Sequence, residues 1–124
     1  MKTVYILGSI AVLIAAIVVI TANSGGPGEY DEFAKCLADS GFKFYGAYWC
    51  PHCQDQKEMF GNSADELPYI ECSLPKRAGQ TTACIQAGIT SYPTWELPSG
   101  KRLSGVIGIE ELRSLSGCEI DQSQ

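Results

Sequence analysis

The chain has 124 residues, of which 45% are hydrophobic, and it carries a formal net charge of −5 at pH 7. Its nine basic residues form no stripe along the sequence, which excludes a nucleic-acid-binding surface. Six cysteines in so short a chain indicate persistent disulfides and therefore an oxidising compartment. The length without the N-terminal segment allows one compact domain but not two cores.

An uncharged apolar segment over residues 4–22 begins the chain. As a helix it would be roughly 29 Å long, close to the hydrocarbon thickness of a bilayer. We therefore predict a membrane anchor over residues 1–22. A cleaved signal peptide is the alternative, but this segment is longer than the usual apolar region of one, and Ile20 fits poorly three residues before a cleavage site.

The charges around this segment predict its orientation. Lys2 precedes it, whereas acidic residues follow it from Glu29 onward. The positive-inside rule then places a single-pass protein in the cell membrane with its C-terminal domain on the extracytoplasmic side. Residues 23–29 are rich in glycine and predict a flexible tether. A folded domain over 30–120 and a tail over 121–124 complete the chain.

The first half of the domain predicts a helix, a strand and a second helix. Residues 30–40 place apolar side chains at helical spacing, and a glycine follows. Residues 42–48 (FKFYGAY) are aromatic and suit a buried central strand. A helix then runs from Pro51, which is tolerated at a first helical position, to Phe60.

The second half predicts another strand over 67–72, a loop over 73–79 and a short helix over 80–87. Strands over 93–97 and 102–106 follow, joined by a turn as a hairpin. The last predicted helix covers 109–115. The order β-α-β-α-β-β-α from residue 42 onward indicates an α/β fold with a mixed central sheet and helices on both faces.

The tetrapeptide Cys50-Pro51-His52-Cys53, entered from Trp49, is the strongest chemical signal. Two thiols at this spacing can close into a disulfide and reopen. A helix N-terminus favours the thiolate of Cys50 over its thiol. His52 adds a second positive charge when it is protonated. This combination is typical of a redox centre.

Zinc and haem are weaker interpretations of the same motif. A CxxC is half of a common zinc site, but the sequence has no second CxxC, and His52 lies between the cysteines. Covalent haem requires a histidine directly after the second cysteine, where Gln54 stands. We therefore expect no metal and no cofactor other than the redox-active disulfide itself.

This motif, followed by Tyr92-Pro93-Thr94 before a hairpin, resembles the thioredoxin-like superfamily over roughly residues 30–118. Further shared positions are similar to the thioredoxin-like domain found fused to vitamin K epoxide reductase homologues: Tyr45 to Gln54, Lys57, Phe60, Gly61, Cys72, Cys84 and Tyr92 to Trp95. The resemblance implies a thioredoxin-like fold, which here would follow the N-terminal transmembrane helix predicted above.

The resemblance also implies roles for individual residues. Cys50 would be the nucleophile and Cys53 the resolving cysteine. Pro93 would be cis and would pack against both sulfurs, leaving the Tyr92 backbone free to pair with a bound peptide. The implied catalytic set is Cys50, Cys53, His52, Pro51 and Pro93, and the implied substrate groove is Trp49, Tyr92 and Thr94.

Two positions depart from the family pattern. Phe44 stands where thioredoxins carry a buried aspartate that helps proton transfer. Tyr92 stands before the proline, where the family usually has a small or β-branched residue. The first departure disfavours a reductant, and the second makes substrate preference hard to transfer.

Four cysteines lie outside the motif. The resemblance implies a structural Cys72–Cys84 disulfide, with a pair that relays electrons as the alternative. Cys36 and Cys118 then remain near the two ends of the domain. They could pair with each other, remain buried thiols or contact another chain.

Several other side chains have two interpretations. Lys57 follows Cys53 by one turn and could influence its proton, although a solvated lysine is the simpler interpretation. Glu71 could relay a proton, but the default for a carboxylate at a strand end is the surface. Four aromatic residues are most simply core or groove residues: Tyr45, Tyr48, Phe60 and Trp95.

Pro-His between the cysteines is the pair found in oxidising DsbA-type enzymes, whose potential is about −120 mV against about −270 mV for thioredoxin. We therefore predict a membrane-anchored thiol–disulfide oxidoreductase that donates or carries disulfides to protein thiols. A quinone-linked membrane partner of the vitamin K epoxide reductase type would reoxidise it. The alternatives are a thioredoxin-like reductase or isomerase, and a non-catalytic binding or chaperone domain.

Overall fold

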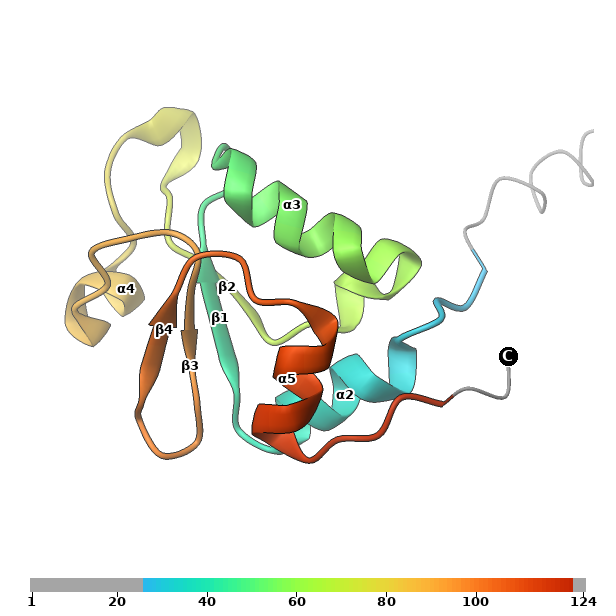
Figure 1. The fold of residues 1–124 in the computed structure, drawn as a ribbon. Helices are drawn as coiled ribbons and strands as arrows, with labels where there is room; N and C mark the ends of the chain where they lie inside the picture. The colour runs from blue at the N-terminus through green and yellow to red at the C-terminus, as the bar shows by residue number, and fades with distance from the viewer. Residues whose placement is uncertain (1–25, 122–124) are drawn as a thin grey trace, which may run out of the picture.

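The computed structural model describes residues 26–121 (Figure 1). The predicted anchor over 1–22 and the first part of the tether lie outside the described residues. Within 26–121, no helix has the length and apolar character needed to cross a membrane.

The described chain alternates helices with short strands. In order, the elements are α2 (Asp31–Asp39), β1 (Lys43–Gly46), α3 (Pro51–Phe60), the 3-10 helix η1 (Gly61–Glu66), β2 (Tyr69–Glu71), the 3-10 turn η2 (Pro75–Arg77), α4 (Thr82–Ala87), β3 (Thr94–Glu96), β4 (Arg102–Ser104) and α5 (Ile109–Ser116).

The strands form one mixed sheet in the order β2-β1-β3-β4. Strand β1 is parallel to β2 and antiparallel to β3, and β3 pairs with β4 as a hairpin. The predicted mixed α/β architecture is therefore confirmed, and it is compatible with a thioredoxin-like fold. All four strands are shorter than predicted, and β4 begins at Arg102 as predicted but ends two residues early.

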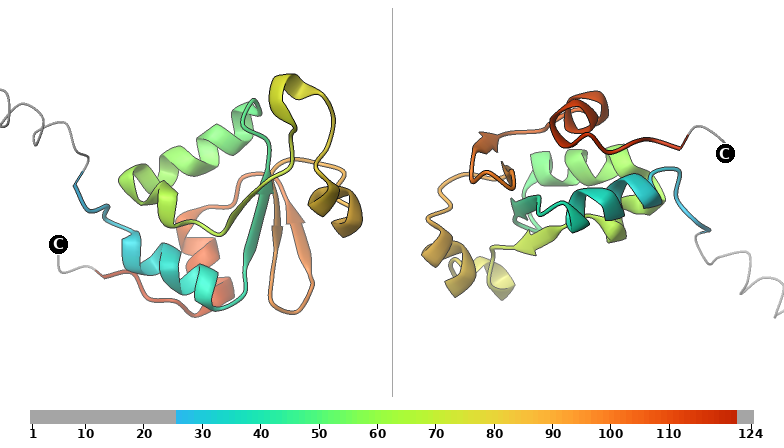
Figure 2. Two further views of the ribbon diagram at one scale, coloured as in Figure 1. Left: turned by 180° about the vertical axis from the view of Figure 1, so that it is seen from behind. Right: turned by 90° about the horizontal axis from the view of Figure 1, so that it is seen from below.

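The main core lies on one face of the sheet. A row of large side chains crosses that face in register, and in it Phe44 stacks on Trp95 with ring centroids 4.9 Å apart. Helices α2, α3 and α5 pack on this row through Leu37, Phe60 and Leu112. Figures 1 and 2 show these three helices on one side of the strands and α4 on the other.

The opposite face is covered at one end only. There Tyr45 packs with Cys72, Cys84 and Ile89 beneath α4. At the other end the same face carries an ion-pair row, in which Glu96 lies 3.2 Å from Lys43 and 2.8 Å from Arg102. Among the described elements, α4 is therefore the one helix on this face. Charged side chains cover the other end of the face.

The helix predicted to end at Phe60 does end there, with Gly61 as its C-cap, and the 3-10 helix η1 follows directly. One local prediction was wrong. The helix predicted from Gln80 begins at Thr82 instead. Gln80 forms a β-bridge with Ser73, and its side chain donates hydrogen bonds to the Ile89 carbonyl and the Tyr92 hydroxyl, both at 2.8 Å. These contacts hold Gln80 in the preceding loop, so the helix begins two residues later than predicted.

A buried glutamine joins α3 to the core. Gln56 has no exposed surface. Its Oε1 accepts hydrogen bonds from Trp95 Nε1 at 3.0 Å and from the Ile107 N–H at 2.8 Å, while its Nε2 donates to the Ile107 carbonyl at 2.9 Å. One side chain thus satisfies three buried polar groups on two other segments.

Replacing Gln56 with leucine should lower the free energy of unfolding by about 3–5 kcal/mol, because it leaves three buried groups without partners while keeping the side-chain volume. Chemical denaturation measures this loss. The control is Glu58→Ala, an exposed position on the same helix, which should change stability by less than about 0.5 kcal/mol. Equal losses in both variants would contradict the assigned role.

Candidate active site

Strand β1 delivers the cysteine motif to the start of α3. The chain leaves the sheet after Gly46, and Cys50 becomes the N-cap of α3, with φ −80° and ψ 120°. Pro51 occupies the first turn, where its missing N–H leaves no bond unmade. The Gln54 N–H donates to the Cys50 carbonyl at 3.1 Å and fixes the first helical turn.

Both motif cysteines are thiols in this structure and both are buried, Cys50 at 7% exposure and Cys53 at 0%. The Cys50 thiol lies against the second half of the domain, where it donates to the Tyr92 carbonyl at 3.7 Å. The Tyr92–Pro93 peptide bond is cis, and Pro93 is fully buried. The structure therefore brings the cysteine motif and the distant proline loop together.

Burial raises the pKa of Cys53 to about 12, because it disfavours the charged thiolate. A hydrogen bond from the Ala47 backbone and the positive charge of Lys57 act in the opposite direction. Cys53 is consequently a neutral thiol at physiological pH. Of the two cysteines, Cys50 is the one with some exposed surface.

The raised pKa of Cys53 predicts how fast its thiol is alkylated at different pH values. In a Cys50→Ser variant, alkylation of Cys53 should be slow at pH 7 and should accelerate about tenfold per pH unit toward its pKa of about 12, because only the thiolate reacts. Quantifying the alkylated peptide by mass spectrometry at several pH values tests this. A plateau in the rate near pH 8 would contradict the raised pKa.

His52 lies apart from the sulfurs' buried surroundings. Its side chain is 73% exposed, and its Nδ1 lies 3.4 Å from Asp55 Oδ2, one turn along α3. The His52 backbone lies between the two cysteines, as expected. Its imidazole, however, lies next to the exposed carboxylate of Asp55.

The predicted groove residues surround Cys50 unequally. Trp49 and Tyr92 contact each other edge to face, with ring centroids 6.1 Å apart. Thr94 is buried within β3, and its hydroxyl donates to the Ser91 carbonyl at 2.8 Å. Trp49 and Tyr92 thus form a wall beside Cys50, whereas Thr94 supports the proline loop from below.

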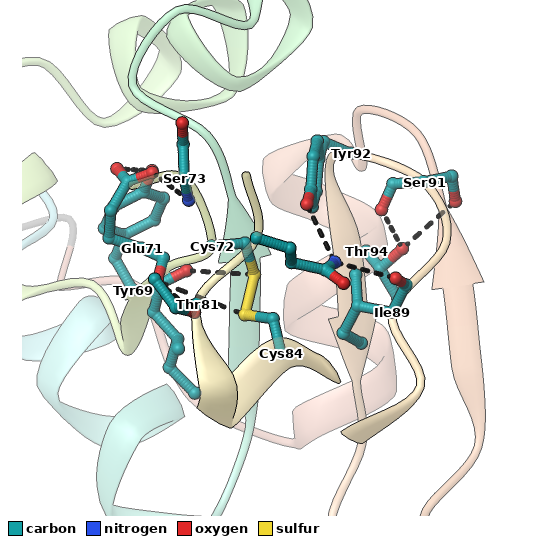
Figure 3. The surroundings of a disulfide bond; sticks show 12 residues. Tyr69, Glu71, Cys72, Ser73, Thr81, Cys84, Ile89, Ser91, Tyr92 and Thr94 are labelled. Atoms are coloured by element: carbon teal, nitrogen blue, oxygen red, sulfur yellow. Dashed lines mark hydrogen bonds between the residues drawn. A yellow bond between two sulfur atoms is a disulfide. The ribbon is translucent and has the colours of Figure 1, made fainter. Parts of the chain in front are cut away.

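A disulfide joins Cys72 at the end of β2 to Cys84 in α4, with the two sulfurs 1.97 Å apart (Figure 3). The loop between them carries residues that hold the groove. Ser73 Oγ accepts a hydrogen bond from Trp49 Nε1 at 2.8 Å, and the Arg77 guanidinium lies over the Trp49 ring at 4.8 Å. No periodic signal in the sequence indicates these contacts, because the loop reaches the groove only in the folded chain.

A second disulfide joins Cys36 in α2 to Cys118 after α5, across a sequence separation of 82 residues. Of the alternatives left open for these two cysteines, the structure has the mutual pair. The bridge ties the first helix of the domain to its last segment.

The structure shows the surroundings of the side chains that had two interpretations in the sequence. Tyr48 is 45% exposed, so it is not a core residue. Its hydroxyl accepts a hydrogen bond from the Arg77 N–H at 3.3 Å. Glu71 is partly buried and bonded, accepting from the Tyr69 hydroxyl at 2.7 Å and from the Ser73 N–H at 2.8 Å. Lys57 lies over the Tyr69 ring, 3.6 Å from its centroid.

Metal-ligating side chains do not cluster in the part of the chain that the structure describes. Among residues 26–121, no group of three or more His, Cys, Asp or Glu residues is placed to hold a metal ion.

Comparison with known proteins finds a relative of the domain. No family model matches the sequence. The chain is similar to thiol-disulfide oxidoreductase LTO1 from Arabidopsis thaliana, with 45% identity over 94 residues. The match covers 73% of this chain and 25% of the relative, so the chain spans about a quarter of the relative's length.

Proposed function

We propose that this chain, homologous over most of its length to part of a thiol-disulfide oxidoreductase, is itself a thiol–disulfide oxidoreductase that uses the Cys50–Cys53 pair. The contact between the Cys50 thiol and the Tyr92 carbonyl beside cis Pro93 carries this proposal. It places the more exposed of the two cysteines at a wall where an extended peptide could pair with the backbone. A purely structural pair would not need such a wall.

The reaction is a two-step exchange. In the oxidising direction, a substrate thiolate attacks Cys50 Sγ of the closed disulfide, and Cys53 leaves as a thiolate and takes up a proton. A second substrate thiolate then attacks the substrate sulfur of this mixed disulfide and releases Cys50 as a thiolate. The substrate gains one disulfide, and the protein gains two electrons and becomes a dithiol.

We further propose that the protein acts as a disulfide donor or carrier at a membrane. The support is the Pro-His pair between the cysteines, the apolar N-terminal segment and the absence of a buried carboxylate at Phe44, which is fully buried beside Trp95. A quinone-linked membrane oxidoreductase of the vitamin K epoxide reductase type would reoxidise the dithiol. The anchor would then bring both proteins into one membrane plane.

Two measurements on the full chain test these proposals. The oxidised protein should introduce disulfides into a reduced, unfolded protein substrate, and the pair should equilibrate with glutathione at a potential nearer to about −120 mV than to about −270 mV. A potential near about −270 mV would assign the chain as a reductase or isomerase. If the chain catalyses no exchange although both Cys50 and Cys53 are intact, the enzymatic proposal is overturned and a binding domain is favoured.

A further inference from the structure

The first turn after Cys53 places a positive charge on the same helix face as the buried sulfur. Lys57 follows Cys53 by four residues, and side chains at this spacing are neighbours on a helix. Cys53 has no exposed surface, whereas Lys57 is partly buried. A lysine at such a position can keep its charged end near solvent while its stem crosses apolar surface.

The Tyr69 ring fixes where this charge lies. Lys57 Nζ is 3.6 Å from the ring centroid, which is a close cation–π contact. Tyr69 is itself held from two sides: its hydroxyl donates to Glu71 Oε2 at 2.7 Å, and its ring meets the Phe44 ring edge to face at 5.0 Å. The lysine therefore rests on an immobilised aromatic face.

Gly46 shows how close Tyr69 comes to the resolving sulfur. A Cβ added at Gly46 would lie 2.7 Å from Tyr69 Cε2 and 2.9 Å from Cys53 Sγ. The tyrosine ring and the sulfur thus both reach the same point beside the β1 backbone. Only glycine leaves room for this approach.

We propose that Lys57 is the cation that stabilises the Cys53 thiolate during disulfide exchange, and that Tyr69 is the positioning residue that holds Lys57 in place. This inference rests on the proposed function, because it assigns the group that assists the Cys53 half of the same exchange. The charge of Lys57 opposes the effect of burial on the pKa of Cys53, which agrees with this placement. The lysine takes the place of a buried carboxylate as the charged neighbour of the resolving cysteine.

The assisted step is intramolecular resolution. Cys53 gives its proton to solvent, and its thiolate attacks Cys50 Sγ of a mixed disulfide. The Cys50–Cys53 bond forms, the bond between Cys50 and the partner sulfur breaks, and the partner leaves as a thiolate. In the reverse direction Cys53 is the leaving thiolate, so the same cation assists both directions.

Other titratable groups surround the same sulfur. Cys50, at the N-cap of α3, raises the pKa of Cys53 through a hydrogen bond and through its charge. Tyr69 and Glu71 come from β2, and Asp65 of η1 lines a surface pocket together with Lys57 and Tyr69. In a mixed disulfide Cys50 carries no charge. The charge of Lys57 then acts on the Cys53 thiolate without competition from the other motif cysteine.

Reaction of the reduced full chain with excess dithionitrobenzoate separates the two cysteines in time. Attack by Cys50 releases the first coloured thiol, and attack by Cys53 on the resulting mixed disulfide releases the second. Lys57→Met should slow the second phase about tenfold and move its pH profile about one unit upward, leaving the first phase unchanged. Lys57→Arg should keep the second phase close to that of the unmodified chain.

Variants of Tyr69 separate its ring from its hydroxyl. Tyr69→Phe keeps the aromatic face and should leave the second phase within about twofold of normal, whereas Tyr69→Leu should slow it as Lys57→Met does. Lys101→Met, an exposed position in the hairpin turn, controls for loss of one positive charge. Lys57→Gln provides a second neutral variant if Lys57→Met does not fold.

Three outcomes would overturn the inference: an unchanged second phase in Lys57→Met, a slower second phase with no shift in pH profile, or a slow Tyr69→Phe variant. A slow Tyr69→Phe variant would indicate that the Tyr69 hydroxyl and Glu71 handle the Cys53 proton. The proposed function fails separately, because a chain that oxidises no protein thiols can still react with dithionitrobenzoate in two phases. Loss of the first phase, by contrast, would indicate a defect at Cys50.

Discussion

The full chain carrying Cys53→Ser should lose turnover and accumulate as a mixed disulfide between Cys50 and a disulfide-bearing partner. Cys50 keeps its place at the groove and can still attack a partner disulfide, but no second thiol remains to resolve the mixed disulfide. We expect catalysed exchange to fall by about a hundredfold or more. Non-reducing electrophoresis followed by mass spectrometry of the adduct measures the trapped species.

Cys50→Ser is the matched control for this trap. It should lose turnover to the same extent and yet form no adduct, because the remaining Cys53 sulfur is buried and its pKa is raised to about 12. The two variants differ only in which sulfur survives. An adduct on Cys53 in the Cys50→Ser chain would reverse the assigned roles.

Removing the Cys36–Cys118 bridge by alanine substitution of both residues should lower the free energy of unfolding by about 4–5 kcal/mol. The bridge closes a loop of 82 residues, and a closed loop of that length strongly restricts the unfolded chain. Chemical denaturation measures the loss. A background with Cys50→Ala and Cys53→Ala prevents the redox pair from reshuffling the remaining bridge.

The Cys72–Cys84 bridge provides the comparison. It closes a loop of only 12 residues, so its removal by alanine should cost about 3 kcal/mol. In a chain that keeps Cys50 and Cys53, however, removing the Cys72–Cys84 bridge should impair exchange more than removing the Cys36–Cys118 bridge does. Its loop carries the Ser73 and Arg77 contacts to Trp49. A larger stability loss from the short loop would contradict the entropic argument.

Local sequence signals were enough for the elements that carry the cysteines. An aromatic run predicts β1, and Pro51 after Cys50 predicts the start of α3, because both signals act within a few residues. The hairpin of β3 and β4 follows in the same way from its turn residues. These predictions depend on backbone preferences that a single segment expresses alone.

The contacts that complete the site depend on tertiary structure. Gln56 lies on the helix as one polar residue among several, and only the folded chain brings Trp95 and Ile107 to its amide. The Lys57–Tyr69 contact likewise joins a helix to a strand through a close approach at Gly46. No spacing rule within one segment encodes such a meeting.

The Cys36–Cys118 bridge also determines how the domain would carry mechanical load. The described chain enters the domain through α2, and the bridge connects that helix directly to the segment after α5. A pull between residues 26 and 121 would pass through the first turns of α2 and across the sulfurs, bypassing the sheet and the cysteine motif enclosed between them. A force applied at these two ends would therefore leave the geometry around Cys50 unloaded.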